Sequence, residues 1–175
     1  MLTAPRAEYL ASLELFAGNS RAAARAREGL RSASLVNGLA VSDILLLTPG
    51  ELPRTLEEAL TRLLPDGHLG AERRVTLYWE VYGSGDAVLP RVAVTVSRVR
   101  ASRVRRLAEK LGLRDEPQTV EMAWETDVPL GRAATGGITL DLRDRPAGTW
   151  RVSVTIIGPG GATASTARDL VLGGR

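Results

Sequence analysis

The sequence lacks cysteine altogether, and among its 175 residues it has a single histidine, His68, and a single lysine, Lys110. The absence of cysteine excludes disulfides, thiolate metal sites and a cysteine nucleophile. One histidine leaves little material for a histidine-based catalytic or metal site. The chain also has no apolar run near the ~18 residues that a membrane-spanning helix needs. These absences leave the compartment open and make an enzyme the least favoured class of function.

What the sequence does contain is a series of strand-like runs separated by turn signals. The runs alternate apolar and polar residues or are continuously apolar, as strands of layered β proteins are. They are Tyr9–Phe16, Leu39–Leu47, Val75–Tyr82, Val92–Val99, Thr119–Trp124, Ile138–Leu142, Trp150–Ile157 and Asp169–Leu172. A chain of this length suits one domain that buries roughly 70% of its unfolded surface. The sequence therefore predicts a mainly β fold: a single immunoglobulin-like β-sandwich over residues 1–175, with one or two short helices in its connections.

Two segments between the predicted strands have the pattern of short helices. Thr55 and Glu58 have the spacing of a capping box, which predicts a helix over Thr55–Leu64. Its leucines at positions 56, 60 and 63 predict packing against an end or edge of the sandwich. Ser102–Leu111 is also amphipathic and is followed by Gly112. Both helices are expected to serve as connections within a β protein.

Other connections are read from turn residues. Ser20–Glu28 fits a short helix, but its alternation of alanine and arginine also fits an extended segment. Asn37–Gly38 predicts a type I′ hairpin, because both residues accept the positive φ that this turn requires. Gly158–Gly161 predicts a hairpin loop rather than a phosphate loop, since strand-like runs flank it on both sides.

The charge balance favours no partner by itself. A pI near 9.9 accompanies a net charge of only +3, and 22 of the 23 basic residues are arginine, whose high pKa lifts the pI. One segment, Arg91–Arg114, carries eight basic residues against Glu109 alone. Clustered arginines bind phosphates, but this segment has no interleaved aromatic residue, so a solvated face is favoured over a polyanion site. The candidate polyanion-binding residues are Arg98, Arg100, Arg103, Arg105, Arg106 and Lys110.

Few other residues offer chemistry. His68 follows a Pro-Asp-Gly turn, where an exposed imidazole is ordinary, and no nucleophile is identified beside it. Gly83–Asp86 is interpreted as a polar turn, and the paired acids Asp115–Glu116 and Asp141/Asp144 as solvated turns without the ligand density of a calcium loop. No catalytic, cofactor-binding or metal-binding residue is predicted, and no cofactor is expected. Trp79, Trp124 and Trp150 are interpreted as core residues, because each lies in a strand-like run.

Three runs carry a resemblance to a known family. They are SDILLL at 42–47, LYWEVYG at 77–83, and LDL at 140–142 with PAGTWRVSV at 146–154. In this order they resemble the C-terminal β-sandwich region of bacterial GWxTD-domain proteins, although no Gly-Trp-x-Thr-Asp motif occurs in this chain. The resemblance implies the terminal module of an exported, multi-domain bacterial protein and implies no known activity.

The leading functional hypothesis is a non-catalytic accessory or protein-interaction domain, whose partner is a protein or another domain of a parent chain. The alternative is a polyanion-binding or nucleic-acid-binding module that works through Arg98–Lys110. No membrane span is expected, and Met1–Leu10 lacks the apolar stretch of a secretory signal. The chain is therefore expected either to stay in the cytoplasm or to be a piece of a longer protein.

Overall fold

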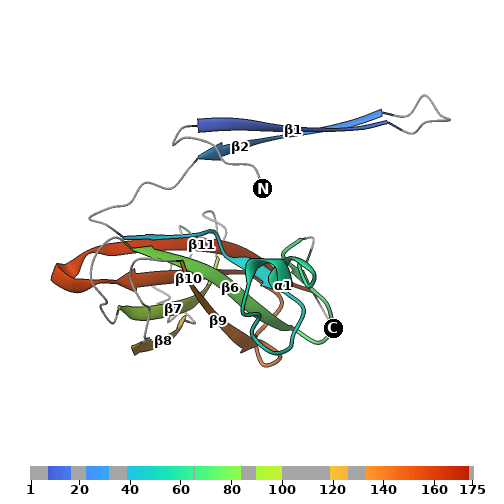
Figure 1. Cartoon of the computed structure of the whole chain (residues 1–175). Helices are drawn as coiled ribbons and strands as arrows, with labels where there is room; N and C mark the ends of the chain where they lie inside the picture. The colour runs from blue at the N-terminus through green and yellow to red at the C-terminus, as the bar shows by residue number, and fades with distance from the viewer. Residues whose placement is uncertain are drawn as a thin grey trace, which may run out of the picture. The chain divides into compact units, whose positions relative to one another are not determined.

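The computed structural model describes residues 8–16, 23–31, 39–64, 66–83, 90–99, 119–125 and 133–173 (Figure 1). The chain divides into two compact units, Met1–Ser34 and Leu35–Arg175. No helix among the described residues is long and apolar enough to cross a membrane.

The first unit is a β-hairpin. Strand β1 (Glu8–Phe16) pairs antiparallel with β2 (Ala23–Arg31), in a register that places Glu8 opposite Arg31 and Phe16 opposite Ala23. The predicted strand at Tyr9–Phe16 is confirmed. For Ser20–Glu28 the extended interpretation is correct and the helix is wrong over its described part. The alternation of alanine and arginine there has the two-residue period of a strand.

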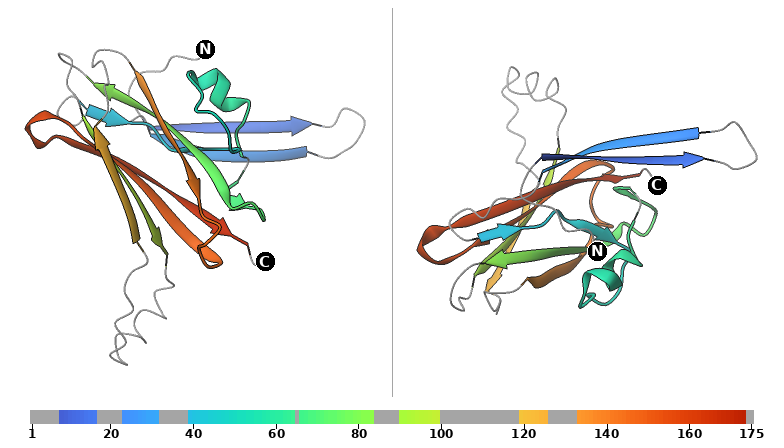
Figure 2. Two further views of the ribbon diagram at one scale, coloured as in Figure 1. Left: turned by 90° about the horizontal axis from the view of Figure 1, so that it is seen from below. Right: turned by 45° about the horizontal axis from the view of Figure 1, so that its top comes forward.

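The described residues of the second unit form nine strands in two sheets, so the predicted mainly β class is confirmed (Figure 2). The five-stranded sheet has the order β5-β11-β10-β7-β8, in which only β5 and β11 pair in parallel. Its strands are β5 (His68–Leu69), β7 (Arg91–Arg98), β8 (Thr119–Glu125), β10 (Gly148–Ile157) and β11 (Thr163–Leu172).

The four-stranded sheet is organised around one long strand, β6. Strands β3 and β4 follow each other along one side of β6, and β9 pairs antiparallel along its other side. Among the described strands, β8 and β9 are therefore edge strands of their respective sheets. The strands are β3 (Leu39–Val41), β4 (Leu45–Leu47), β6 (Arg74–Gly83) and β9 (Ala134–Asp141).

The core takes alternate residues from both sheets. Along β10 the buried positions are Trp150, Val152, Val154 and Ile156, and the residues between them are partly or fully exposed. Valine side chains of β7 and the inward side chains of β6 join the same apolar cluster. This two-residue period explains why the strands were visible in the sequence.

The predicted strand Leu39–Leu47 is broken into β3 and β4. Between them, the Ser42 amide donates to the Glu80 carbonyl at 2.9 Å, and the Ser42 hydroxyl accepts from the Glu80 amide, also at 2.9 Å. The serine side chain thus takes the place of a ladder partner and interrupts the strand. A continuous apolar run gives no sign of such an interruption.

The predicted helix Thr55–Leu64 is shorter than expected and packs differently. Helix α1 covers only Leu56–Leu60, and Ala59 is its buried residue, so the expected packing through its leucines is wrong. Beyond the helix, the chain turns to pair with β4: the Leu64 amide donates to Leu46 O at 2.7 Å. These main-chain bonds to a strand replace the next helical turn.

The cap of α1 is close to the prediction. The Thr55 hydroxyl accepts from the Glu58 amide at 3.2 Å, whereas the Glu58 carboxylate accepts from the amide of Arg54, one residue before the cap, at 2.8 Å. The Gly158–Gly161 loop joins β10 to β11 as predicted, and Gly160 and Gly161 adopt positive φ there. Asn37–Gly38, Ser102–Leu111 and positions 84–86 of the predicted polar turn lie outside the described residues.

Candidate functional site

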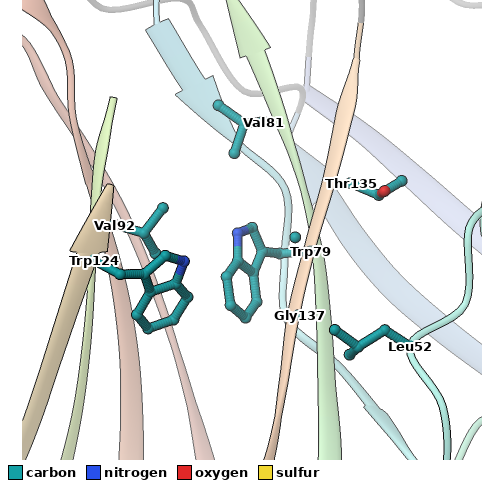
Figure 3. Close-up of a pocket in the computed structure, with 8 residues that line it drawn as sticks. Leu52, Trp79, Val81, Val92, Trp124, Thr135 and Gly137 are labelled. Atoms are coloured by element: carbon teal, nitrogen blue, oxygen red, sulfur yellow. The ribbon is translucent and has the colours of Figure 1, made fainter. Parts of the chain in front are cut away.

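A pocket of about 190 Å³ opens between the two sheets, at the side where the edge strands β8 and β9 lie (Figure 3). Edge strands of separate sheets do not bond to each other, so side chains rather than main-chain bonds close this side. Residues from four strands and from the segment before α1 line the pocket: Leu52, Trp79, Val81, Val92, Trp124, Thr135, Gly136 and Gly137.

Two tryptophans that pack against each other form part of the pocket wall. Trp79 comes from β6 and Trp124 from β8; their ring centres are 6.4 Å apart, and the ring planes are tilted by 48° (Figure 3). Trp79 is 1% exposed and Trp150, elsewhere in the core, is fully buried, which confirms the core prediction for both. Trp124 is only partly buried, because it stands on the edge strand at the open side.

Two adjacent glycines of β9 give the pocket its shape. A Cβ at Gly136 would lie 2.6 Å from Cε2 of Trp79, and a Cβ at Gly137 would lie 2.6 Å from Cδ2 of Leu52. Neither distance is tolerated by real side chains, so the indole of Trp79 and the side chain of Leu52 lie directly against the β9 backbone. Glycine inside a strand is a signal of such a close approach.

The indole nitrogen of Trp79 has no hydrogen-bond partner among the described residues, although it is buried. Leaving a buried donor unpaired costs about 1–3 kcal/mol. In contrast, the indole nitrogen of Trp150 donates to Pro146 O at 3.1 Å. Of these two buried indoles, it is therefore the one in the pocket wall, Trp79, whose N–H lacks a partner among the described residues.

A second polar feature lies on the outward positions of β6, where Tyr78, Glu80 and Tyr82 alternate with core residues. The Tyr78 hydroxyl donates to Oε1 of Glu80 at 3.2 Å, and the Tyr82 hydroxyl donates to Oε2. Burial and the neighbouring Glu80 raise the pKa of Tyr78 above its ordinary value and raise the pKa of Tyr82 to about 12. Both phenols therefore stay protonated at neutral pH and hold the carboxylate against the strand.

An exposed group of leucines surrounds α1. We call it the leucine surface: Leu52, Leu56, Leu60 and Leu63, which are 49%, 40%, 52% and 41% exposed. Leu52 belongs both to this surface and to the rim of the pocket. The sequence identified the leucine stripe but predicted that it faces inward.

His68 is exposed, as predicted, and forms the first residue of β5. Nδ1 of His68 lies 3.3 Å from the carboxylate of Asp66. The aspartate also accepts from the His68 amide at 3.0 Å, so the pair belongs to the turn before β5. Both side chains are well exposed to solvent, in the manner of a surface turn rather than a catalytic cleft.

The basic segment can be placed only in part. Arg98 lies at the end of β7, where Nη2 donates to Ala147 O at 3.1 Å. The candidate residues Arg100, Arg103, Arg105, Arg106 and Lys110 lie outside the described residues, as does the pair Asp115–Glu116. The polyanion hypothesis therefore stays a prediction.

Of the two acids predicted to form a solvated turn at Asp141/Asp144, Asp144 lies in a turn, whereas Asp141 is the last residue of β9, and both are exposed. Asp141 accepts Nε of Arg143 at 2.9 Å, and this contact lowers the pKa of Asp141 below its usual value. Among the residues that the structure describes, no group of three histidines or acids is placed to hold a metal. The buried Arg73 donates to Arg145 O at 2.7 Å and to Gly173 O. Its guanidinium therefore links the turn after β9 to the residue that follows β11.

Comparisons with known proteins assign no family to this chain. No family model and no curated protein matches the chain, so membership of the GWxTD family stays a prediction. The chain is similar to the crystal structure of the sporulation control protein Spo0M from Bacillus subtilis, at 12% identity and a TM-score of 0.44. The match covers 80% of this chain and 51% of that one, so the chain spans about half the length of that structure. We base no functional inference on this likeness.

Proposed function

We propose that residues 35–175 form an immunoglobulin-like β-sandwich that serves as a non-catalytic interaction domain and binds a protein partner through the leucine surface. The observation that carries the proposal is the exposure of four leucines within the twelve positions from 52 to 63. Apolar side chains gathered at one place on a protein surface are typical of interaction sites. Scattered single leucines need no such explanation, but a cluster does.

The local fold explains why the leucines face outward. Because α1 ends after five residues and the chain then pairs with β4, the only side chain that the helix buries is Ala59. Leu56 and Leu60 are one helical turn apart and present a common face. The strand pairing thus holds the leucine surface in a fixed position on the body of the domain.

The charges beside the leucine surface indicate the chemistry of its partner. Three exposed acids, Glu51, Glu57 and Glu58, stand beside the leucines in the sequence against one exposed arginine, Arg54. The other arginine, Arg62, turns its guanidinium to Thr48 O at 2.6 Å and to Glu51 O. The complementary partner is a protein surface with an apolar centre and basic residues around it.

Trp150 supports the immunoglobulin-like assignment. Its indole donates to the carbonyl of Pro146, four residues upstream, at the start of the long strand β10. Immunoglobulin-like domains have a comparable feature, the tyrosine corner, in which a hydroxyl bonds to the backbone a few residues upstream. The pairing of two sheets over one core points the same way.

Photo-crosslinking tests the proposed interaction. A photoreactive amino acid is placed at Leu56 or Leu60 and, as a control, at Ser165, which is exposed on β11. Crosslinked proteins from the native host are identified by mass spectrometry, purified, and titrated against the wild-type chain. We expect one partner to crosslink at the leucine positions and not at Ser165.

The double variant Leu56→Glu with Leu60→Glu then decides the role of the leucine surface. Buried apolar anchors dominate binding energy, so its affinity for the partner should fall tenfold or more, roughly 1.4 kcal/mol. The control Ser165→Glu should bind like the wild type. Unchanged affinity in the double variant, with an unchanged melting temperature, would overturn the proposal.

A further inference from the structure

We propose that the pocket between β8 and β9 binds a small, uncharged, flat ring compound that carries a hydrogen-bond acceptor. This goes beyond the proposed protein interaction, because it assigns a separate ligand to a separate site. Three properties of the pocket carry it: its size, the chemistry of its walls and the unpaired donor of Trp79.

The volume sets the size of the ligand. Drug-sized ligands occupy pockets of roughly 300–1,000 Å³, whereas this pocket measures about 190 Å³. An apolar cavity of about 150 Å³ is known to accept benzene. A single ring or two fused rings is therefore the largest group that fits without rearrangement.

The walls set the polarity of the ligand. Leu52, Val81 and Val92 add aliphatic surface to the two indoles, and none of the lining residues is ionisable. A charged ligand would lose its hydration without gaining a partner here. The tilted indoles of Trp79 and Trp124 instead offer faces on which a ring packs in an offset or edge-to-face arrangement.

The unpaired nitrogen of Trp79 sets the orientation of the ligand. An indole N–H donates and does not accept, so the group that satisfies it must be an acceptor such as a ring nitrogen or a carbonyl oxygen. This nitrogen lies against the β9 backbone at Gly136, and Figure 3 shows it on the side of the indole toward Val81, which also lines the pocket. A ligand acceptor there would supply the bond that no described residue makes.

The position of the pocket provides access. It lies between edge strands, with the partly exposed Trp124 on one side and Leu52, 49% exposed, at its rim. A small molecule therefore reaches the pocket without unpairing any described strand. Gly136 and Gly137 add no side chain to this wall, and Thr135 is the one residue of β9 in the lining that carries a side chain.

Quinoline and naphthalene form a matched pair of probes, because they share size and shape and differ by one ring nitrogen. Each is titrated into the full chain with ¹⁵N-labelled tryptophan, and the indole N–H signals are followed by NMR. We expect quinoline to shift the signals of Trp79 and Trp124 and to leave that of Trp150, which is bonded to Pro146, unchanged. Because the probes differ by one neutral hydrogen bond, quinoline should bind about threefold to tenfold more tightly than naphthalene.

Two variants separate the role of the donor from that of the walls. Trp79→Phe keeps an aromatic wall and removes the donor, so the two probes should then bind equally. Trp124→Ala removes the outer wall and should weaken both probes. Leu60→Glu, which changes the leucine surface and not the pocket, should leave quinoline binding unchanged, so that a failure of the proposed protein interaction is distinguished from a failure here.

Each other outcome overturns a stated part of the proposal. If neither probe shifts the Trp79 and Trp124 signals up to its solubility limit, the pocket is not a ligand site. If the wild-type chain binds both probes equally, or if Trp79→Phe retains the preference for quinoline, Trp79 does not select an acceptor.

Discussion

Removal of the Trp150 side chain should be among the most damaging single changes to this fold. The side chain of Trp150 is fully buried in the core between the two sheets. Its indole nitrogen donates to Pro146 O, and the guanidinium of Arg145 lies 5.9 Å from the centre of its ring. Truncation of a buried tryptophan to alanine costs about 3–5 kcal/mol through lost transfer energy and the cavity left behind. Because Pro146 is exposed, water replaces the lost donor, and the hydrogen bond adds only about 0.5–1.5 kcal/mol. We therefore expect Trp150→Ala to lower the free energy of unfolding by roughly 5 kcal/mol.

Urea unfolding followed by far-ultraviolet circular dichroism measures this loss, since the signal does not depend on the tryptophan that is removed. Trp150→Phe, which keeps most of the apolar surface and loses the donor, should cost about 1–2 kcal/mol and stays measurable if the alanine variant does not fold. Trp124→Ala serves as a control and should cost less than Trp150→Ala, because its side chain is only partly buried. A loss below about 1.5 kcal/mol for Trp150→Ala would refute the assignment of this indole to the centre of the core.

Three further changes test other parts of the structure. Gly136→Ala should destabilise the fold by about 1–3 kcal/mol in thermal unfolding, because the new Cβ would overlap the Trp79 indole. The control Gly70→Ala, at a position with open space around it, should be neutral or slightly stabilising. Thr55→Ala should cost about 1 kcal/mol through loss of the helix cap, measured by urea unfolding against Thr55→Ser, which keeps the hydroxyl and should be near neutral. The tyrosinate absorbance of Tyr82 should develop near pH 12 rather than 10. Because the folded-state pKa is raised, the contribution of Tyr82 to stability is complete below pH 10 and is lost as the pH rises toward 12. This pH dependence should vanish in Tyr82→Phe. Titration of all tyrosines near pH 10 in the folded protein would contradict this last expectation.

The strands were largely predictable because their two faces meet different surroundings. In β10, residues that face the core alternate with residues that face outward, and the sequence of Trp150–Ile157 carries this period directly. In β9 the prediction began at Ile138, but the strand begins at Ala134. Gly136 and Gly137 add no apolar side chain to the sequence pattern, but in the fold they allow the close approach of Trp79 and Leu52.

The helix was predictable at its start and not at its end. The start depends on Thr55 and Glu58, which are three residues apart, so the signal is local. The end depends on strand β4, more than ten residues earlier, whose backbone pairs with the chain after Thr61. No periodicity within residues 55–64 reports that competing partner, and for this reason the leucine stripe was assigned to the wrong side.

Trp79 and Trp150 show why the candidate site was the least predictable part of the molecule. Both are tryptophans in strand-like runs, and both were correctly expected to be buried. The hydrogen bond of Trp150 is to a residue four positions away, so its environment is set by the local turn at Pro146. The environment of Trp79 is set by Trp124 and Gly136, which are about fifty residues away in the sequence and meet it only because β8 and β9 are edge strands on the same side of the two sheets. A buried donor that lacks a partner among the described residues is therefore visible only in the fold, and our proposal of a ligand rests on its presence in an open, uncharged pocket.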